Sequence, residues 1–386
     1  MTDWQTRAQH LADELSAAGK LRSPRWQQAV AQVPRHKLVP TYYTYIDNGW
    51  QPADTSSPRG RQRWLELVYS NKALFVLPDG LSTTSMPGLM TRMLEALDVH
   101  DGHRVLEIGT GSGYNAALLC HRLGDEHVFS VDIDAELIGL ARTRLAAIGY
   151  RPTLVATDGS LGLAEHAPFD RVIATCSVPS IPWAWVRQTR VGGLILADLK
   201  LGGHAGNLVL LQRGDDRAEG RFDPTYGSFM SIRQSAPPPP SLPYPNRDRA
   251  TATASVTHLD LVRPWEHLVF WFFVHLDTDL GGACHGQVMD PATGQPGDAF
   301  LATPDGSWCE ISVHPDGGGR EVWQGGPRRL WDQIEAADQR WSHLGQPGWE
   351  RFGLTVTEQG HTVWLDAADG DHSWPLPRRP VSQDSS

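Results

Sequence analysis

Residues 104–114 read RVLEIGTGSGY, a short apolar run that leads into three glycines at alternate positions. Val, Leu and Ile in such a run are typical of a strand that is buried on both faces. The glycines at 109, 111 and 113 allow a sharp turn and a close approach of a ligand to the main chain, because no Cβ stands in the way. A helical pattern begins at Tyr114. The stretch therefore predicts a strand, a ligand-binding turn and a helix, in that order.

The same alternation continues on the C-terminal side of this stretch. Four more apolar runs predict strands at residues 127–131, 153–156, 171–175 and 193–199, and helical patterns occupy residues 114–123 and 135–148. Strands that alternate with helices predict an α/β fold with a doubly wound parallel sheet. Ligands of such sheets bind at the carboxyl ends of the strands, which is where the glycine turn is expected.

A proline-rich segment separates two parts of the chain. Residues 235–249 contain six prolines, which favour an extended linker. The composition changes beyond it, because nine of the fifteen tryptophans fall in the last 137 residues. The expected domains are residues 1–234 and residues 250–386, joined by this linker.

Further elements are expected on both sides of the linker. Residues 3–18 predict a helix that ends at Gly19, and Ser23-Pro24 marks the start of a second helix that stops at Pro34. The C-terminal domain is expected to be α+β. Its predicted elements are strands at residues 268–276, 309–314, 352–357 and 361–365 and an amphipathic helix at residues 330–344 with Gly345 as its C-cap.

The composition argues against several classes of protein. Lys and Arg total 34 against 44 Asp and Glu, a net charge of −10 that disfavours a nucleic-acid partner. No run approaches the roughly 20 apolar residues of a membrane span, and no export signal is visible at the start, so a cytoplasmic protein is expected. The four cysteines are far apart and are expected to be reduced. The histidines lack metal-ligand spacing, so no metal site is expected.

Acidic residues stand at three successive strand ends. Glu107 lies two places before the first glycine, Asp132 follows the second predicted strand, and Asp158 ends the third. A single acid of this kind is more often a solvated loop residue or a helix N-cap. Three in this order favour a nucleotide-like ligand, because a carboxylate can accept hydrogen bonds from ribose hydroxyls.

The E-x-G-x-G-x-G form of the turn resembles the nucleotide loop of class I S-adenosylmethionine-dependent methyltransferases and differs from the G-x-G-x-x-G loop of NAD-binding proteins. The resemblance implies a Rossmann-like class I domain that binds S-adenosyl-L-methionine and releases S-adenosyl-L-homocysteine. It also implies that Asp132 contacts the ribose and Asp158 the adenine amino group. The expected cofactor-binding residues are Glu107, Gly109, Thr110, Gly111, Gly113, Asp132, Ile133, Asp158, Gly159 and Thr175.

An ordered set of motifs narrows the resemblance to one family. The segments that resemble protein-L-isoaspartate O-methyltransferases, besides the glycine turn, are residues 33–40, 69–74, 83–87, 158–160, 168–173 and 181–193. They span residues 20–232, about half of the chain. The family implies transfer of a methyl group to a peptide carboxylate. Such an acceptor is already ionised at neutral pH, so the reaction needs no strong general base.

Two hydroxyl side chains are expected to be catalytic. Ser85 aligns with the family's active-site hydroxyl and is expected to hold the acceptor carboxylate, and Thr84 precedes it. The alternative role of Ser85 is an N-cap of the helix that begins near Pro87. Cys176 is expected to line the cofactor pocket as a small apolar residue, because sulfonium chemistry needs no thiol nucleophile.

The chain departs from the general repair enzymes of this family in two places. Those enzymes carry Gly-x-Gly-Gln where this chain has Asp79-Gly80-Leu81-Ser82, and the short repair form lacks a tryptophan-rich extension. In both departures the chain resembles the actinobacterial branch of the family, whose members work beside ATP-grasp ligases in graspetide biosynthesis. That resemblance implies methylation of one ordinary aspartate in a ligase-crosslinked, ribosomally made precursor peptide, after which the ester closes to an aspartimide (a succinimide).

Two other functions are compatible with the sequence. One is general repair of L-isoaspartyl residues by the same methyl transfer, and the other is a catalytically idle protein that escorts a peptide. The tryptophan-rich extension is expected either to recognise the peptide through an aromatic surface or to be an ordinary apolar core. The sequence leaves the oligomeric state open.

Overall fold

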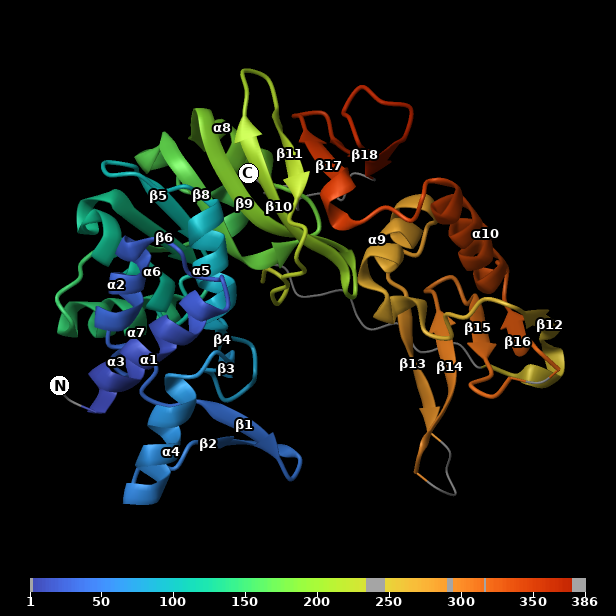
Figure 1. Cartoon of the computed structure of the whole chain (residues 1–386), viewed down its shortest axis with the longest axis horizontal. Helices are drawn as coiled ribbons and strands as arrows, with labels where there is room; N and C mark the ends of the chain where they lie inside the picture. Colours follow the sequence, from blue (N-terminus) through green and yellow to red (C-terminus); the bar gives the residue numbers. More distant parts are fainter. Residues whose placement is uncertain (1–2, 234–246, 290–293, 316, 377–386) are drawn as a thin grey trace.

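The computed structural model describes residues 3–233, 247–289, 294–315 and 317–376 (Figure 1). Most of the predicted linker at residues 235–249 lies outside the described residues.

A mixed sheet of ten strands forms the centre of the molecule, in the order β19-β18-β17-β11-β10-β9-β8-β5-β6-β7. Its last five strands pair in parallel, which confirms the predicted doubly wound α/β fold. They are β9 (Thr189–Gly202), β8 (Phe169–Val178), β5 (Val105–Ile108), β6 (Val128–Asp132) and β7 (Thr153–Ala156). The predicted helices α6 (Tyr114–Leu123) and α7 (Ala135–Ala147) follow β5 and β6.

The central strands are apolar on both faces because both faces of the sheet are covered. All four residues of β5 are buried. Val105 belongs to a core shared with the N-terminal helices, whereas Leu106 and Ile108 belong to a core shared with the C-terminal region. Burial on both faces explains why these runs show no alternation of apolar and polar residues.

The N-terminal helices follow the sequence signals. α1 (Asp3–Ala17) ends just before Gly19, whose φ is 69°, and α2 (Pro24–Gln32) has Ser23 as its N-cap. The other helices are α3 (Arg35–Leu38), α4 (Pro58–Val68), α5 (Pro87–Ala96), α8 (Trp183–Gln188), α9 (Leu268–Asp277) and α10 (Leu330–His343).

Strands from both sides of the proline-rich segment join the large sheet. β11 pairs antiparallel with β17, and the Thr355 hydroxyl donates to Glu219 Oε2 at 2.7 Å across that pair. The antiparallel half of the sheet comprises β10 (Ala205–Arg213), β11 (Ala218–Phe222), β17 (Phe352–Val356), β18 (His361–Leu365) and β19 (Ser373–Leu376). The division into residues 1–234 and 250–386 as folding units stays a prediction, and the two ranges share one sheet and one hydrophobic core.

The strand predicted at residues 268–276 is wrong, because this segment forms the helix α9. The run LVFWFFVHL is apolar without interruption, and such a run fits a buried helix as well as a buried strand. Residues 270–274 are all buried, and α9 packs against β10 on one side and α10 on another. Burial against these elements therefore explains why α9 is apolar without interruption.

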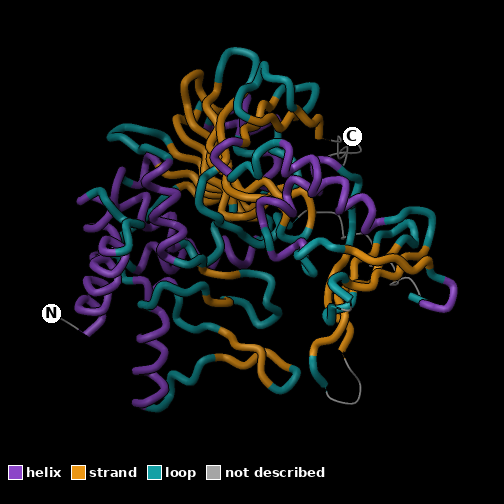
Figure 2. Tube along the Cα trace, turned by 45° about the vertical axis from the view of Figure 1, so that its right-hand side comes forward, coloured by secondary structure: helices purple, strands orange, loops and turns teal. Residues whose placement is uncertain are grey.

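Two smaller sheets flank the centre, and Figures 1 and 2 show them on different sides of the molecule. One has the order β2-β1-β3-β4 and comprises β1 (Tyr43–Ile46), β2 (Gly49–Pro52), β3 (Leu74–Phe75) and β4 (Thr83–Thr84). The other has the order β12-β16-β15-β14-β13 and comprises β12 (Thr253–Thr257), β13 (Cys284–Met289), β14 (Pro296–Ala302), β15 (Trp308–Ile311) and β16 (Arg320–Gly325).

Most of the C-terminal tryptophans belong to the core. Seven of the nine are buried, and Trp323 and Trp374 are half-buried. Most of these side chains therefore form an ordinary apolar core and not the expected aromatic surface.

Candidate active site

A cavity of about 470 Å³ opens at the carboxyl ends of β5, β6 and β8, where the fold predicts a ligand. It is lined by ten of the twelve residues predicted for the site: Thr84, Ser85, Glu107, Gly109, Thr110, Gly111, Asp132, Ile133, Gly159 and Thr175. Gly113 and Asp158 are not among its lining residues. The structure thus brings most of the predicted residues together, and their roles in binding stay predictions.

Glycine is needed at these positions of the turn for two different physical reasons. Gly109 has a φ of 96°, and a Cβ there would lie 2.7 Å from Thr175 Oγ1, which donates to the Gly109 carbonyl. Gly111, with a φ of 50°, also faces the cavity. Gly113 instead packs against α7, because its Cβ would lie 3.3 Å from Leu145. Two glycines therefore shape the cavity and the third lets α6 approach α7.

Glu107 is a fully buried carboxylate behind the glycine turn. Its Oε1 accepts from Asn115 Nδ2 at 2.8 Å, and its Oε2 accepts from the Ser130 hydroxyl at 2.5 Å. Burial raises the pKa of Glu107 to about 7 despite these two bonds. Asn115 Oδ1 is buried, lines the cavity and has no hydrogen-bond partner within the described part of the chain. Glu107 and Asn115 thus place buried acceptor atoms behind the cavity wall, and such atoms fit the ammonium group of a ligand such as S-adenosyl-L-methionine.

We expect Glu107→Gln to change how stability depends on pH. The pKa of Glu107 rises on folding from 4.5 to about 7, so the native state keeps a proton that the unfolded chain has lost. Stability from this group is therefore lost as pH rises through that window. The free energy of unfolding of the variant relative to the wild type should improve by about 2 kcal/mol from about pH 5 to about pH 8. Urea unfolding of the ligand-free protein measures this difference.

The exposed Glu14 on α1 provides the matched control for this prediction. Glu14→Gln should leave the difference from wild type constant across the same pH range. A constant difference for Glu107→Gln as well would contradict the shifted pKa.

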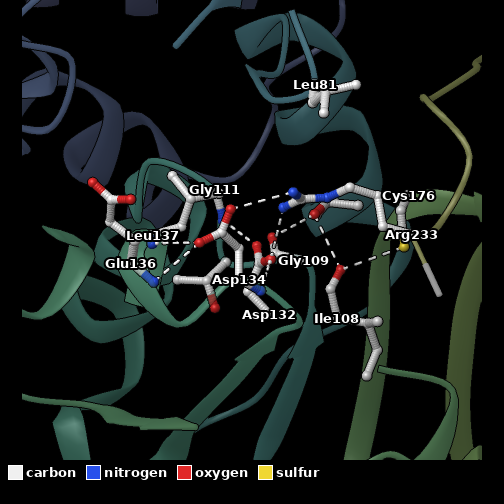
Figure 3. A network of polar contacts seen from close by, with 12 residues as sticks. Leu81, Ile108, Gly109, Gly111, Asp132, Asp134, Glu136, Leu137, Cys176 and Arg233 are labelled. Carbon is white, nitrogen blue, oxygen red and sulfur yellow. Dashed lines mark hydrogen bonds and ion pairs between the residues drawn. The ribbon is translucent and has the colours of Figure 1, made fainter. Parts of the chain in front are cut away.

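Asp132 is held at the end of β6 with its carboxylate in the cavity wall. Its Oδ2 accepts from Gly111 N at 3.0 Å, and its Oδ1 accepts from Asp134 N at 3.1 Å. Arg233 closes the network from the opposite side, because its Nη2 lies 3.2 Å from Asp132 Oδ1 and its Nη1 lies 3.3 Å from Asp134 Oδ2 (Figure 3). The position of Asp132 therefore fits the predicted contact with ribose hydroxyls. One of its two carboxylate oxygens, Oδ1, is already paired with Arg233.

We expect Arg233→Ala to strengthen the binding of S-adenosyl-L-methionine by about threefold, the scale of a partly exposed ion pair. The guanidinium holds the Asp132 oxygen that a ribose hydroxyl would need. Isothermal titration calorimetry measures the change. Arg190→Ala is the control, because Arg190 pairs with Asp170 at the opposite edge of the sheet, and it should change nothing. Weaker binding in Arg233→Ala would instead make Arg233 a ligand of the cofactor.

Ser85 lies where β4 gives way to α5. The N-cap of α5 is Met86, so Ser85 does not take the alternative role of helix cap. Its hydroxyl makes no hydrogen bond to any other residue that the structure describes, and it lines the cavity. The buried Arg35 donates to the Ser85 carbonyl at 3.2 Å and to the Val68 carbonyl at 2.7 Å. The backbone of Ser85 is therefore fixed while its hydroxyl stays available to an acceptor.

Asp158 has a different environment from the other two acids. It is the N-cap of a short 3-10 helix and accepts from Ser160 N at 2.9 Å. Its neighbour Gly159 does line the cavity, and a Cβ there would lie 2.6 Å from Ile108 Cγ2. The cap describes the side chain of Asp158 in this structure, and the contact with adenine stays a prediction.

Sequence reasoning missed the segment at residues 228–233, which forms one wall of the cavity. The segment runs beside β8, where Ile232 N donates to the Ser177 carbonyl at 2.8 Å. Asp198 on β9 accepts from Phe229 N at 2.8 Å, and Lys200 donates to the Phe229 carbonyl at 2.6 Å. Asp198 and Lys200 are charged residues within the otherwise apolar run at residues 193–201, and they were the signal that could have revealed this anchor.

Cys176 lines the cavity, as the sequence predicts. Burial raises the pKa of its thiol to about 12, so the side chain remains protonated at neutral pH. It therefore resembles an apolar lining residue and not an activated nucleophile. The four cysteines form no disulfide with one another.

No cluster of His, Cys, Asp and Glu within the described residues is arranged to hold a metal ion. None of the helices in the described part of the chain is both long enough and apolar enough to span a membrane.

Comparison with known proteins places the chain in a family. The family model described as protein-L-isoaspartate(D-aspartate) O-methyltransferase matches residues 6–222, more than half of the chain. Protein-L-isoaspartate O-methyltransferase 2 of Pelobacter propionicus is 35% identical over 208 residues, which cover 53% of this chain and 81% of that protein. Protein-L-isoaspartate O-methyltransferase 1 of Archaeoglobus fulgidus is 32% identical over 229 residues, covering 58% and 92%.

A solved structure titled protein-L-isoaspartate O-methyltransferase shares the fold with a TM-score of 0.55 at 21% identity. The match covers 93% of this chain and 99% of that one, so it extends into the C-terminal region. With the glycine turn, two of the three acidic strand ends and the free Ser85 hydroxyl at one cavity, these matches show that the chain belongs to the protein-L-isoaspartate(D-aspartate) O-methyltransferase family, the S-adenosylmethionine-dependent carboxyl methyltransferases.

Proposed function

We propose that this methyltransferase acts on the side-chain carboxylate of an ordinary aspartate in a ribosomally made, ligase-crosslinked precursor peptide, and that the ester then closes to an aspartimide. One observation carries the proposal. Leu81 and Ser82, which stand where general repair enzymes have the end of Gly-x-Gly-Gln, line the cavity beside Ser85. The departure from the repair motif thus falls at the acceptor side of the cavity and not on a remote surface.

Two sets of residues are proposed to bind the cofactor. Glu107 and Asn115 supply buried acceptor atoms for an ammonium group, and Asp132 supplies a carboxylate for ribose hydroxyls. S-adenosyl-L-methionine, when bound, supplies a methyl group on a positively charged sulfur. The glycines at 109 and 111 line the same cavity.

Positioning of the acceptor is the main catalytic task of the protein. The peptide carboxylate arrives ionised, so Ser85 needs only to donate a hydrogen bond and orient one oxygen toward the methyl carbon. That oxygen gains the methyl group, the carbon–sulfur bond breaks, and S-adenosyl-L-homocysteine is left. In the released ester, the backbone nitrogen of the following residue attacks the ester carbonyl, loses its proton and expels methanol, which closes the five-membered ring.

General repair of L-isoaspartyl residues is the second candidate, and a specific observation favours it. The named relatives are all protein-L-isoaspartate O-methyltransferases. The C-terminal region also has a counterpart in the fold of a solved structure with that title, so the extension alone does not distinguish a tailoring enzyme. Recognition of the peptide by residues 250–386 stays a prediction, and so does a cytoplasmic location.

Intact mass spectrometry tests the proposal against both alternatives. The full chain is incubated with S-adenosyl-L-methionine and either a crosslinked, aspartate-rich precursor or an isoaspartyl model peptide. The proposal expects the precursor to gain one CH₂ and then to show a net loss of one water, which is methylation followed by loss of methanol. The same changes confined to the isoaspartyl peptide would support repair. An enzyme that binds no S-adenosyl-L-methionine in calorimetry would support the idle escort.

A further inference from the structure

Exposed apolar side chains gather at the opening of the cavity. Among the described residues, ten large apolar side chains are exposed, and five of them lie on the cavity rim or on the hairpin beside it: Tyr45, Ile46, Phe75, Leu81 and Met230. Phe75, Leu81 and Met230 line the cavity itself. Single exposed apolar residues are ordinary, whereas a contiguous group beside an active site marks a binding surface.

The hairpin β1–β2 joins this group to the acceptor site through the backbone. Tyr43 on β1 is opposite Phe75 on β3, and Phe75 is in turn opposite Thr83 on β4, which leads directly to Ser85. Figure 1 shows the four short strands side by side below the large sheet. A peptide that lies along the hairpin can therefore place its carboxylate at Ser85 without leaving the surface.

Aromatic rings form a continuous row from this hairpin to Phe75 on β3. Tyr45 and Trp50 are cross-strand partners with ring centroids 5.3 Å apart, and Trp50 and Phe75 have centroids 4.7 Å apart. The exposed fractions of Tyr45 and Ile46 are 58% and 49%. At about 3.3 Å per residue, the row is long enough to contact roughly three residues of an extended peptide.

The loop that replaces the repair motif packs under the same row. Gly80 has a φ of 74°, and a Cβ there would lie 2.2 Å from Trp50 Cζ2, so only glycine fits against the indole. Leu81 N donates to Asp79 Oδ1 at 2.8 Å, and the Leu81 side chain is exposed at the cavity rim (Figure 3). Trp50, Gly80 and Leu81 thus form one structural unit between hairpin and cavity.

The charges of this surface indicate the chemistry of its occupant. Residues 41–52 contain a single charged side chain, Asp47, and residues 73–86 also contain one, Asp79. Neither stretch contains a lysine or an arginine to attract an acidic segment, and the exposed side chains Tyr45, Ile46, Phe75 and Leu81 are aromatic or aliphatic. It therefore fits apolar side chains that flank the acceptor residue.

We propose that Tyr45, Ile46, Trp50, Phe75 and Leu81 form an apolar shelf that binds apolar or aromatic side chains within a few residues of the acceptor aspartate in the peptide substrate. This inference rests on the proposed function in one respect, namely that a peptide carboxylate must reach Ser85. The shelf selects the sequence around the acceptor, whereas the cavity selects the carboxylate.

The test uses the full chain and the variant Tyr45→Ser/Ile46→Ser, which alters the hairpin away from the cavity lining. The probes are synthetic peptides with one aspartyl or isoaspartyl acceptor, either flanked by Leu and Phe on one side or carrying Ser at those places. Docking is measured by fluorescence anisotropy with S-adenosyl-L-homocysteine present, and methyl transfer is measured separately. Wild type should bind the apolar peptides about tenfold more tightly than the Ser peptides, and the hairpin variant should bind both equally.

The matched control is Val191→Ser/Val256→Ser, which removes two apolar side chains of similar exposure, 61% and 59%, away from the cavity lining. It should keep the wild-type preference. A hairpin variant that keeps the preference, or a wild type that shows none, would overturn the shelf. Light scattering that finds a wild-type dimer and a monomeric hairpin variant would also overturn it, by assigning the surface to a second copy of the chain. Docking without methyl transfer to any peptide would support the shelf and refute the proposed function.

Discussion

Replacement of Asp132 by alanine is expected to weaken the binding of S-adenosyl-L-methionine by about 100-fold. The carboxylate is buried at the end of β6, and Gly111 N and Asp134 N hold it in one orientation. The proposed two charge-assisted hydrogen bonds to ribose hydroxyls would contribute roughly 2 to 4 kcal/mol, and alanine supplies neither. Isothermal titration calorimetry on the variant and the wild type measures the dissociation constants.

The neighbouring Asp134 provides the control for this prediction. Asp134→Asn keeps an oxygen for the N-cap of α7 and removes a negative charge that also pairs with Arg233, but Asp134 does not line the cavity. Its dissociation constant should stay within about threefold of the wild type. An unchanged constant for Asp132→Ala, or equal losses for both variants, would remove Asp132 from the cofactor site.

Replacement of Ser85 by alanine is expected to lower kcat by about 100-fold while the affinity for S-adenosyl-L-methionine remains near that of the wild type. We propose that the hydroxyl donates to the acceptor carboxylate, and loss of one preorganised donor costs roughly 3 kcal/mol in the transition state. The backbone contact with Arg35 does not depend on the side chain, so the local fold should persist. Methyl transfer under saturating cofactor measures kcat.

Ser85→Thr is the conservative partner of this variant, because it retains a hydroxyl at the same place. It should recover part of the turnover that Ser85→Ala loses. If Ser85→Ala turns over as fast as the wild type, the hydroxyl has no catalytic role and the acceptor must be held by other groups.

The sequence predicts the parallel half of the sheet well because its signals are local. β7 and α6 occupy the predicted residues, since apolar runs, glycines and helical periodicity coincide there. The pairing of β11 with β17 could not be predicted in the same way. These strands are more than 120 residues apart, and each presents apolar residues that would suit several partners. The sequence wrongly predicts a strand at α9, because uninterrupted burial removes the periodicity that distinguishes a helix from a strand.

The site was predictable where the chemistry lies in a motif. The glycine turn follows β5 of the large sheet and Ser85 follows β4 of a small sheet, and residues of both motifs line one cavity. Arg233, Asn115 and Arg35 act through contacts that are distant in sequence or through burial, and neither is visible in a linear pattern. Asp158 differs from these residues. It stands at the strand end that the sequence predicts, but in this structure its carboxylate is the N-cap of the adjacent 3-10 helix.

We propose that this carboxyl methyltransferase prefers an ordinary aspartate in a crosslinked peptide to an isoaspartyl residue. A competition experiment tests it most directly, with both peptides at equal concentration in one reaction and products followed by mass spectrometry over time. The crosslinked precursor should be consumed first, with a kcat/KM at least about tenfold higher. Earlier consumption of the isoaspartyl peptide would contradict it and would identify the protein as a repair enzyme.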